Sequence, residues 1–201
     1  SGMWSVTLGP VKPDIYPYNF IVDGISVMDP ANEDFFPNER FKGSLLDVPG
    51  ETPLIHAMQN VPHGTVNYEY YPSAEGTTGS LVVYTPPGYE KNTTQKYPVF
   101  YLISGTTDTE ETFFKVGKVN FILDNLIAEK KAVPMVIVMS NGMVQTVTEE
   151  GERIVDFKLL ENQLLTDIMP YIEKKFRVGR TKKMRAMAGL SMGSLQTSII
   201  G

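Results

Sequence analysis

The sequence predicts an α/β fold in which a parallel sheet is covered by helices and preceded by a β-rich segment. Three continuous apolar runs, at 99–104, 135–140 and 184–189, are typical of strands buried on both faces. Apolar residues at helical spacing indicate two helices, at 118–130 and 157–176, that alternate with these strands. Because strand–helix alternation produces parallel neighbours, we expect the three strands to pair in parallel and both helices to pack on the sheet.

The first 36 residues alternate large apolar and polar side chains, a pattern typical of half-buried strands. Asp23-Gly24 is a favoured two-residue hairpin turn. Two or three strands are too few for an independent sandwich. We therefore interpret residues 1–36 as the C-terminal end of a β-sandwich module, 37–60 as a surface linker rich in Pro and Gly, and 61–201 as the main domain.

The main domain opens with two strand-like runs, 64–71 and 79–89, joined by the turn-forming stretch "PSAEGTTG". The long amphipathic pattern at 157–176 predicts a helix that bends near Pro170, because proline interrupts helical hydrogen bonding. After the last buried strand, "SLQTSIIG" begins a further helix.

Composition excludes several function classes. The net charge of −5 and the absence of a long basic cluster argue against nucleic acid or an anionic membrane as the partner. The chain has no cysteine, which excludes disulfides, thiolate catalysis and zinc–thiolate sites. No apolar stretch approaches the ~20 residues of a membrane span. No signal peptide opens the chain, which starts in the middle of a pattern.

One short motif carries the chemistry. "GLSMG", from Gly189 to Gly193, matches G-x-S-x-G and lies between a strand-like and a helix-like run. In a nucleophile elbow, glycines two residues before and after the serine prevent collisions where strand and helix approach closely. The helix N-terminus beneath Ser191 favours developing negative charge. The alternative is a glycine-rich turn that holds an incidental serine.

Six spaced segments together resemble the putative-esterase family of α/β-hydrolases, which includes feruloyl esterases, acetylxylan esterases, esterase D and enterochelin esterase. These segments are "VPHGTV", "VVYTPPGYE", "KYPVFYLISG", "LDNLIAE", "MVIVMSNG" and "AGLSMGS", in the expected order and over about residues 61–201, with the serine motif among them. The segment "YPYNFIVDGISVMDPAN" resembles the end of an immunoglobulin-like carbohydrate-associated module. The resemblance implies the N-terminal portion of an α/β-hydrolase sheet in a secreted, periplasmic or cell-surface bacterial enzyme.

The resemblance also implies roles for individual residues. Ser191 aligns with the nucleophile, and the backbone N–H groups of Met192 and Thr106 align with the two oxyanion-hole donors. The family usually has histidine and small residues where this chain reads Ser104-Gly105-Thr106-Thr107, and glycine or alanine where it has Ser194. The resemblance implies neither a metal nor a cofactor.

The assignment of Ser191 as the nucleophile also requires a general base that takes its hydroxyl proton. His56 and His63 are the only histidines, and both precede Ser191, whereas the histidine of this fold follows the nucleophile. We expect His63 to be structural. We therefore expect the catalytic acid and histidine to lie after residue 201 and the chain to be a piece of a longer polypeptide.

The implied substrates are esters of plant cell-wall polysaccharide, with feruloyl or acetyl groups on xylan. The alternative is a non-catalytic or weakly active relative that uses the same pocket to bind carbohydrate. Two further features have ordinary structural interpretations beside the functional ones. The acidic run of Asp108, Glu110 and Glu111 is expected to be a solvated helix start rather than a metal site. The aromatic residues near the N-terminus are expected to be divided between a core and a sugar-stacking face; they are Trp4, Tyr16, Tyr18 and Phe20. The oligomeric state is not predictable from the sequence.

Overall fold

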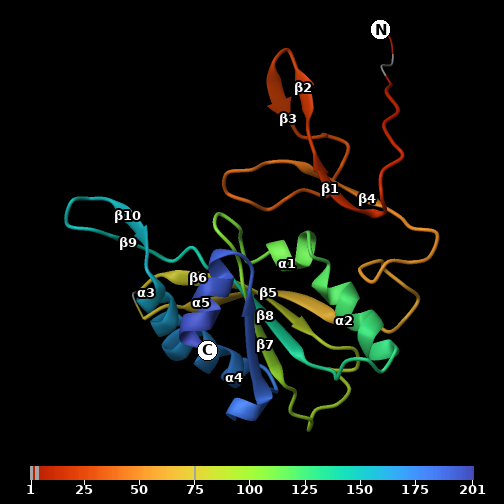
Figure 1. Cartoon of the computed structure of the whole chain (residues 1–201). Helices are drawn as coiled ribbons and strands as arrows, with labels where there is room; N and C mark the ends of the chain where they lie inside the picture. Colours follow the sequence, from red (N-terminus) through yellow and green to blue (C-terminus); the bar gives the residue numbers. More distant parts are fainter. Residues whose placement is uncertain (1, 3–4, 75) are drawn as a thin grey trace.

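A five-stranded mixed sheet forms the centre of the molecule (Figure 1). The computed structural model describes residues 2, 5–74 and 76–201. The strands lie in the order β11-β7-β8-β6-β5. Their bounds are β5 Thr65–Pro72, β6 Thr78–Thr85, β7 Val99–Ile103, β8 Val136–Ser140 and β11 Arg185–Gly189.

The predicted parallel pairing is confirmed. Strand β7 lies between β8 and β11 and pairs in parallel with both, with Val99 opposite Val136 on one side and Arg185 on the other. The sheet is nevertheless mixed, because β5 and β6 form an antiparallel hairpin and β6 is antiparallel to β8. A short turn can join only antiparallel strands, whereas parallel neighbours need a long crossover.

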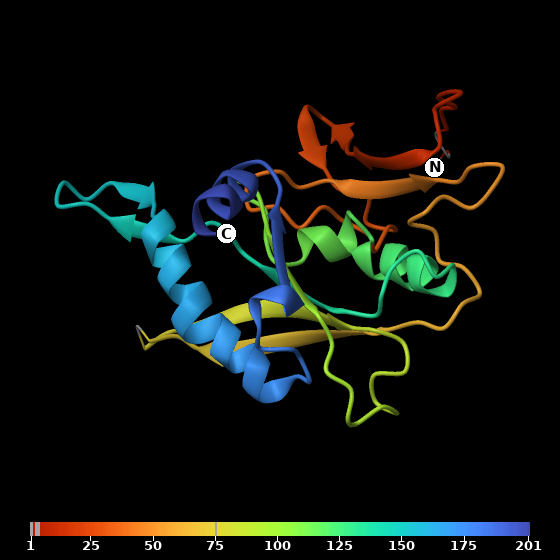
Figure 2. The same cartoon turned by 60° about the horizontal axis from the view of Figure 1, so that its bottom comes forward.

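Helices cover both faces of the sheet (Figures 1 and 2). On one face α2 (Val119–Ala128) packs against alternate residues of β6, β7 and β8. On the other face lie α3 (Phe157–Asn162), the π-helical segment η1 (Gln163–Ile168) and α4 (Met169–Lys175). The helices predicted at 118–130 and 157–176 therefore occupy the expected positions.

The second helix departs from α geometry just before Pro170. The Met169 N–H donates to the Leu164 carbonyl, five residues back, which is the hydrogen bond of a π-helix. Proline lacks an N–H and its ring collides with the carbonyl of a regular preceding turn, so a widened turn accommodates it. The sequence predicted a bend near Pro170, and what the structure shows before the proline is a local widening of the helix over Gln163–Ile168.

The remaining elements are short. They are α1 (Thr112–Lys115), the hairpin β9 (Gln145–Val147) and β10 (Arg153–Val155), the 3₁₀ turn η2 (Lys182–Met184) and α5 (Met192–Ile200). Helix α5 begins directly after Ser191, as expected from the sequence. Among the described residues, no helix combines the length and the apolar character that crossing a bilayer requires.

The N-terminal part consists of two small antiparallel sheets beside the α1 end of the domain (Figure 1). Strands β2 (Phe20–Val22) and β3 (Ile25–Val27) form the predicted hairpin, with Asp23 and Gly24 at positive φ in its turn. Its apolar side chains are largely exposed. Trp4, one of the candidate sugar-stacking residues, lies outside the described residues.

The segment 37–60 differs from the expected surface linker. Strand β1 (Asp14–Tyr18) pairs antiparallel with β4 (Ser44–Val48), which lies within that segment. Ser44 and Leu45 are buried, and the Asn32 side chain donates to the Leu45 carbonyl at 2.7 Å. Proline and glycine on either side concealed this strand, because they flank it without interrupting it.

Candidate active site

Ser191 occupies the sharp turn between β11 and α5. Its backbone has φ 54° and ψ −117°, a conformation that side-chain-bearing residues rarely adopt. The turn is fixed by the Leu190 N–H, which donates to the Ile103 carbonyl at 3.2 Å, and by the Gly193 N–H, which donates to the Leu190 carbonyl at 2.8 Å. Ser191 is exposed. The turn therefore presents a serine hydroxyl to solvent at the carboxyl end of the parallel strands.

The two motif glycines are required by this turn. A Cβ on Gly189 would lie 2.2 Å from the carbonyl carbon and oxygen of Gly193. A Cβ on Gly193 would lie 2.3 Å from the Ile103 carbonyl oxygen. Both distances are far below van der Waals contact, so strand and helix can approach this closely only without side chains.

The loop after β7 lies against Ser191. A Cβ built on Gly105 would be 3.3 Å from the Ser191 Cβ and 3.2 Å from the Leu190 carbonyl oxygen. Parallel pairing of β7 with β11 brings the two loops together. Thr106 is exposed and Met192 is partly exposed. In the described part of the chain, no hydrogen bond uses the backbone N–H of either residue.

Ser104 takes a structural position in this loop. It is fully buried, and its hydroxyl donates to the Asp108 carbonyl at 3.3 Å and accepts from the Gly142 N–H at 3.1 Å. The buried Gln196 of α5 donates to the Gly142 carbonyl at 2.8 Å. Ser104 therefore joins the loop after β7 to the loop after β8.

Both histidines are bound away from Ser191. His63 Nδ1 lies 2.9 Å from Asp124 Oδ2, and His56 Nε2 lies 3.3 Å from Asp47 Oδ1. Within residues 2, 5–74 and 76–201, no hydrogen bond involves the Ser191 hydroxyl. The structure therefore agrees with the sequence argument that neither histidine is the base of Ser191.

The acidic run directly precedes α1, as the sequence predicts, but it is less solvated than expected. Asp108 is buried, whereas Glu110 accepts from the Ser80 hydroxyl at 2.5 Å and Glu111 from the Tyr68 hydroxyl at 2.6 Å. Burial, followed by this hydrogen bond to Glu111, raises the pKa of Tyr68 to about 12. Each carboxylate instead accepts a hydrogen bond from a distant segment, and the described residues contain no acidic or histidine cluster suited to a metal ion.

Sequence reasoning missed Asn38, which contacts the loop beside Ser191. Its side-chain amide donates to Asp108 Oδ1 at 2.8 Å, although the two residues are 70 positions apart. A single asparagine in a Pro-rich and Gly-rich stretch carries no periodic signal of such a contact. The only available indication was the residue type, since asparagine often stabilises turns.

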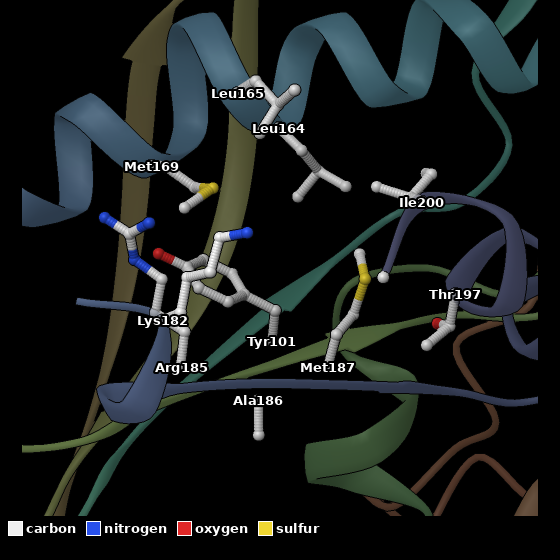
Figure 3. Close-up of a pocket in the computed structure, with 11 residues that line it drawn as sticks. Tyr101, Leu164, Leu165, Met169, Lys182, Arg185, Ala186, Met187, Thr197 and Ile200 are labelled. Atoms are coloured by element: carbon white, nitrogen blue, oxygen red, sulfur yellow. The ribbon is translucent and has the colours of Figure 1, made fainter. Parts of the chain in front are cut away.

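An apolar cavity of about 640 Å³ lies between β11 and the helices η1, α4 and α5. Figure 3 shows Leu164 and Met169 directed toward Tyr101 and Met187 across it. Neither Ser191 nor Thr106 lines this cavity. It is therefore separate from the serine turn and has no part in the site described above.

A model of the Putative esterase family matches residues 75–197. The chain belongs to the Putative esterase family. The match includes the loop after β7, the Ser191 turn and most of α5. The two loops that form the candidate site are therefore part of what this chain shares with the family.

Two curated relatives are bacterial enzymes. The chain is 30% identical to an endo-1,4-beta-xylanase/feruloyl esterase of Xylanibacter ruminicola over 206 aligned positions, which cover all of this chain and 28% of the relative. It is 29% identical to endo-1,4-beta-xylanase Y of Acetivibrio thermocellus, over 67% of this chain and 12% of that protein. The chain thus spans less than a third of the length of either relative.

Solved esterase structures share this fold. A CE1 ferulic acid esterase of Anaeromyces mucronatus, with ferulic acid bound, is 26% identical, with a TM-score of 0.63 over 72% of this chain and 55% of that one. A mutant feruloyl esterase module of Clostridium thermocellum, complexed with sinapinate, is 25% identical, with a TM-score of 0.58 over 73% of this chain and 52% of that one. Enterochelin esterase of Shigella flexneri, at 16% identity, shares the fold with a TM-score of 0.57 over 88% and 43%.

Proposed function

We propose that this chain belongs to the catalytic part of a serine carboxylic-ester hydrolase that removes feruloyl groups from plant cell-wall polysaccharide. The observation that carries the proposal is the exposed Ser191 in a strained strand-to-helix turn beside the loop after β7. The names of the relatives support the substrate class, since one is a xylanase/feruloyl esterase and two structures hold ferulic acid or sinapinate. The second candidate for the acyl group that is removed is an acetyl group on xylan.

The proposed chemistry begins with attack of the Ser191 hydroxyl oxygen on the ester carbonyl. A general base takes the hydroxyl proton, and the negative charge that develops on the carbonyl oxygen is stabilised by the N–H groups of Met192 and Thr106. The alcohol of the sugar leaves with a proton, and the acyl group remains on Ser191 until water releases it. Within the described residues neither His56 nor His63 forms a hydrogen bond with the Ser191 hydroxyl, so in this proposal the base is another group.

The arrangement of the two loops supports the oxyanion assignment. Both N–H groups belong to backbone segments next to Ser191, and neither is used within the described structure. The Met192 N–H also lies at the N-terminus of α5, where the helix dipole favours negative charge. Loss of one such donor typically costs about 3 kcal/mol of transition-state stabilisation.

Polysaccharide substrates are found outside the cell, so we also propose a secreted or cell-surface location. In the same proposal, residues 1–36 end a carbohydrate-associated module. A binding assay on insoluble xylan with and without the N-terminal residues tests this second part.

The experiment that tests the activity uses the natural full-length protein and its Ser191→Ala variant. Methyl ferulate and p-nitrophenyl acetate are the substrates, and intact mass is measured after reaction with a fluorophosphonate. We expect turnover and a single phosphonyl adduct in the wild-type protein, and loss of both in Ser191→Ala. Binding of feruloylated oligosaccharide without turnover or adduct would favour the carbohydrate-binding alternative.

A further inference from the structure

Asn38 connects the N-terminal part of the chain to the loop beside Ser191. It is 7% exposed and forms an isolated antiparallel bridge with Asp108. Its side-chain N–H donates to Asp108 Oδ1 at 2.8 Å, and its Oδ1 accepts from the Thr107 hydroxyl at 3.1 Å. The N–H and the oxygen of one side-chain amide thus bind two consecutive residues of the loop.

The backbone around Asn38 strengthens this attachment. The Glu39 N–H donates to the Thr107 carbonyl at 2.8 Å, and the Thr109 hydroxyl donates to the Pro37 carbonyl at 3.0 Å. Three consecutive loop residues, 107–109, are therefore bound to three consecutive residues of the N-terminal segment, 37–39.

Asn38 is itself rigid. Its Oδ1 accepts from the backbone N–H groups of Arg40 and Phe41, both at 2.9 Å, in a turn that fixes the side-chain orientation. The Lys42 ammonium group donates to the Asn38 carbonyl at 2.6 Å. The amide that binds the loop is consequently preorganised by its own segment.

The loop requires such support because Thr107 is strained. Its φ of 63° is unusual for any residue with a side chain and more so for a β-branched one. Strain of this kind persists only where surrounding contacts impose it. Thr107 directly follows Thr106, so the contacts that hold Thr107 also set the direction of the Thr106 N–H.

We propose that Asn38 is a positioning residue for the oxyanion loop: by holding Thr107 and Asp108, it aims the Thr106 N–H at the oxygen of the reacting ester. The proposal rests on the function proposed above. It gives the side chain of Asn38 a role in catalysis, although no atom of Asn38 touches the substrate.

The test compares Asn38→Ala, Asn38→Asp, Glu39→Ala and Ser191→Ala in the natural full-length protein. Asn38→Asp keeps the acceptor contacts of Oδ1 with Arg40, Phe41 and Thr107 but places a carboxylate against Asp108, so the turn at 38–41 stays folded while the contact with Asp108 is lost. The Glu39 side chain is exposed and makes no hydrogen bond or ion pair in the described structure, which makes Glu39→Ala the matched control. Steady-state kcat and KM are measured with methyl ferulate, and hydrogen–deuterium exchange is measured by mass spectrometry.

A misplaced oxyanion donor slows the chemical step more than it weakens substrate binding. We expect both Asn38 variants to lower kcat about tenfold to hundredfold, with KM changed less than about twofold. Exchange should rise in peptides covering 104–112 and remain unchanged in α2 and α4. Glu39→Ala should match the wild-type protein in both measurements.

The outcomes separate this inference from the function on which it depends. If Ser191→Ala abolishes turnover while both Asn38 variants retain wild-type kcat, Asn38 has no positioning role and the inference fails. The inference also fails if exchange rises throughout the domain and KM changes together with kcat. If Ser191→Ala retains full turnover, the proposed function fails first.

Discussion

His63 and Asp124 form a hydrogen-bonded histidine–carboxylate pair, with His63 Nδ1 2.9 Å from Asp124 Oδ2. The pair has the composition of two members of a catalytic triad, but among the described residues no serine hydroxyl is hydrogen-bonded to either member. Asp124 is 1% exposed and also accepts from the Gly64 N–H at 2.9 Å and from the Tyr84 hydroxyl at 2.5 Å. Burial and the bond to Asp124 raise the pKa of Tyr84. The carboxylate thus joins α2 to the start of β5 and the end of β6.

We expect Asp124→Ala to lower the free energy of unfolding by about 2–4 kcal/mol, because it leaves buried hydrogen-bond donors without a partner. The effect should appear as a lower urea midpoint for unfolding of the domain that contains the five-stranded sheet. His63→Ala, which removes a half-exposed partner, should cost less. Neither change should lower kcat per folded molecule, and a fall in kcat of a hundredfold in His63→Ala with normal stability would contradict the structural assignment.

Replacement of Ser191 by glycine should stabilise the chain relative to replacement by alanine. Both variants lack the hydroxyl, but only alanine retains a Cβ at φ 54°. Glycine adopts this conformation freely, and the relief is about 1 kcal/mol after its larger loss of backbone entropy. Urea unfolding of the two inactive variants measures the difference. Equal midpoints would show that the turn stores no strain.

The motif glycines should respond to alanine in a graded way. Gly193→Ala places a Cβ 2.3 Å from a backbone oxygen that cannot move independently, so we expect a loss of about 3 kcal/mol or failure to fold. In Gly105→Ala the nearest contact is 3.2 Å, which a small shift relieves. Gly105→Ala should therefore remain folded but lower kcat, because the shift moves the oxyanion loop. Thermal unfolding and methyl ferulate kinetics provide the comparison.

Tyr68 should make stability depend on alkaline pH. Its pKa rises from 10.0 to about 12, so the folded chain holds the phenolic proton more tightly than the unfolded chain. The resulting stabilisation is fully present below pH 10 and is lost as pH rises toward 12. Tyr68→Phe should remove this part of the pH dependence. A wild-type minus Tyr68→Phe absorbance titration at ~295 nm should show one phenol with a midpoint near pH 12, and a midpoint near 10 would contradict the assignment.

The elements that the sequence predicted correctly are those with a strong local signal. Continuous apolar runs identified β7, β8 and β11, and the Asp23-Gly24 dipeptide identified the β2–β3 hairpin. The serine turn was recognisable because two glycines and a strand–helix boundary coincide in one short stretch.

The elements that were missed depend on distant partners. Strand β4 lies between prolines and glycines, and only its pairing with β1 reveals it as a strand. The contact between Asn38 and Asp108 joins two polar residues that periodicity cannot relate. The burial of Asp108 follows from that contact, so the same missing information explains why the acidic run was expected to be solvated. The orientation of Thr106 relative to Ser191 stays a prediction.

The widened segment before Pro170 sets the rotational phase of the helix that contains it. Leu160, Leu164, Ile168 and Ile172 are all at most 2% exposed and are spaced by four residues. In a regular α-helix this spacing drifts by about 40° per step, so the fourth side chain would rotate well away from the sheet. The π turn at η1 holds one more residue in its ring and cancels part of the drift. If the same residues formed regular α turns without the widened ring, the extra residue would rotate α4 by about 100°. Ile172 would leave the core, and the Tyr171 hydroxyl would lose its 2.6 Å bond to Glu69.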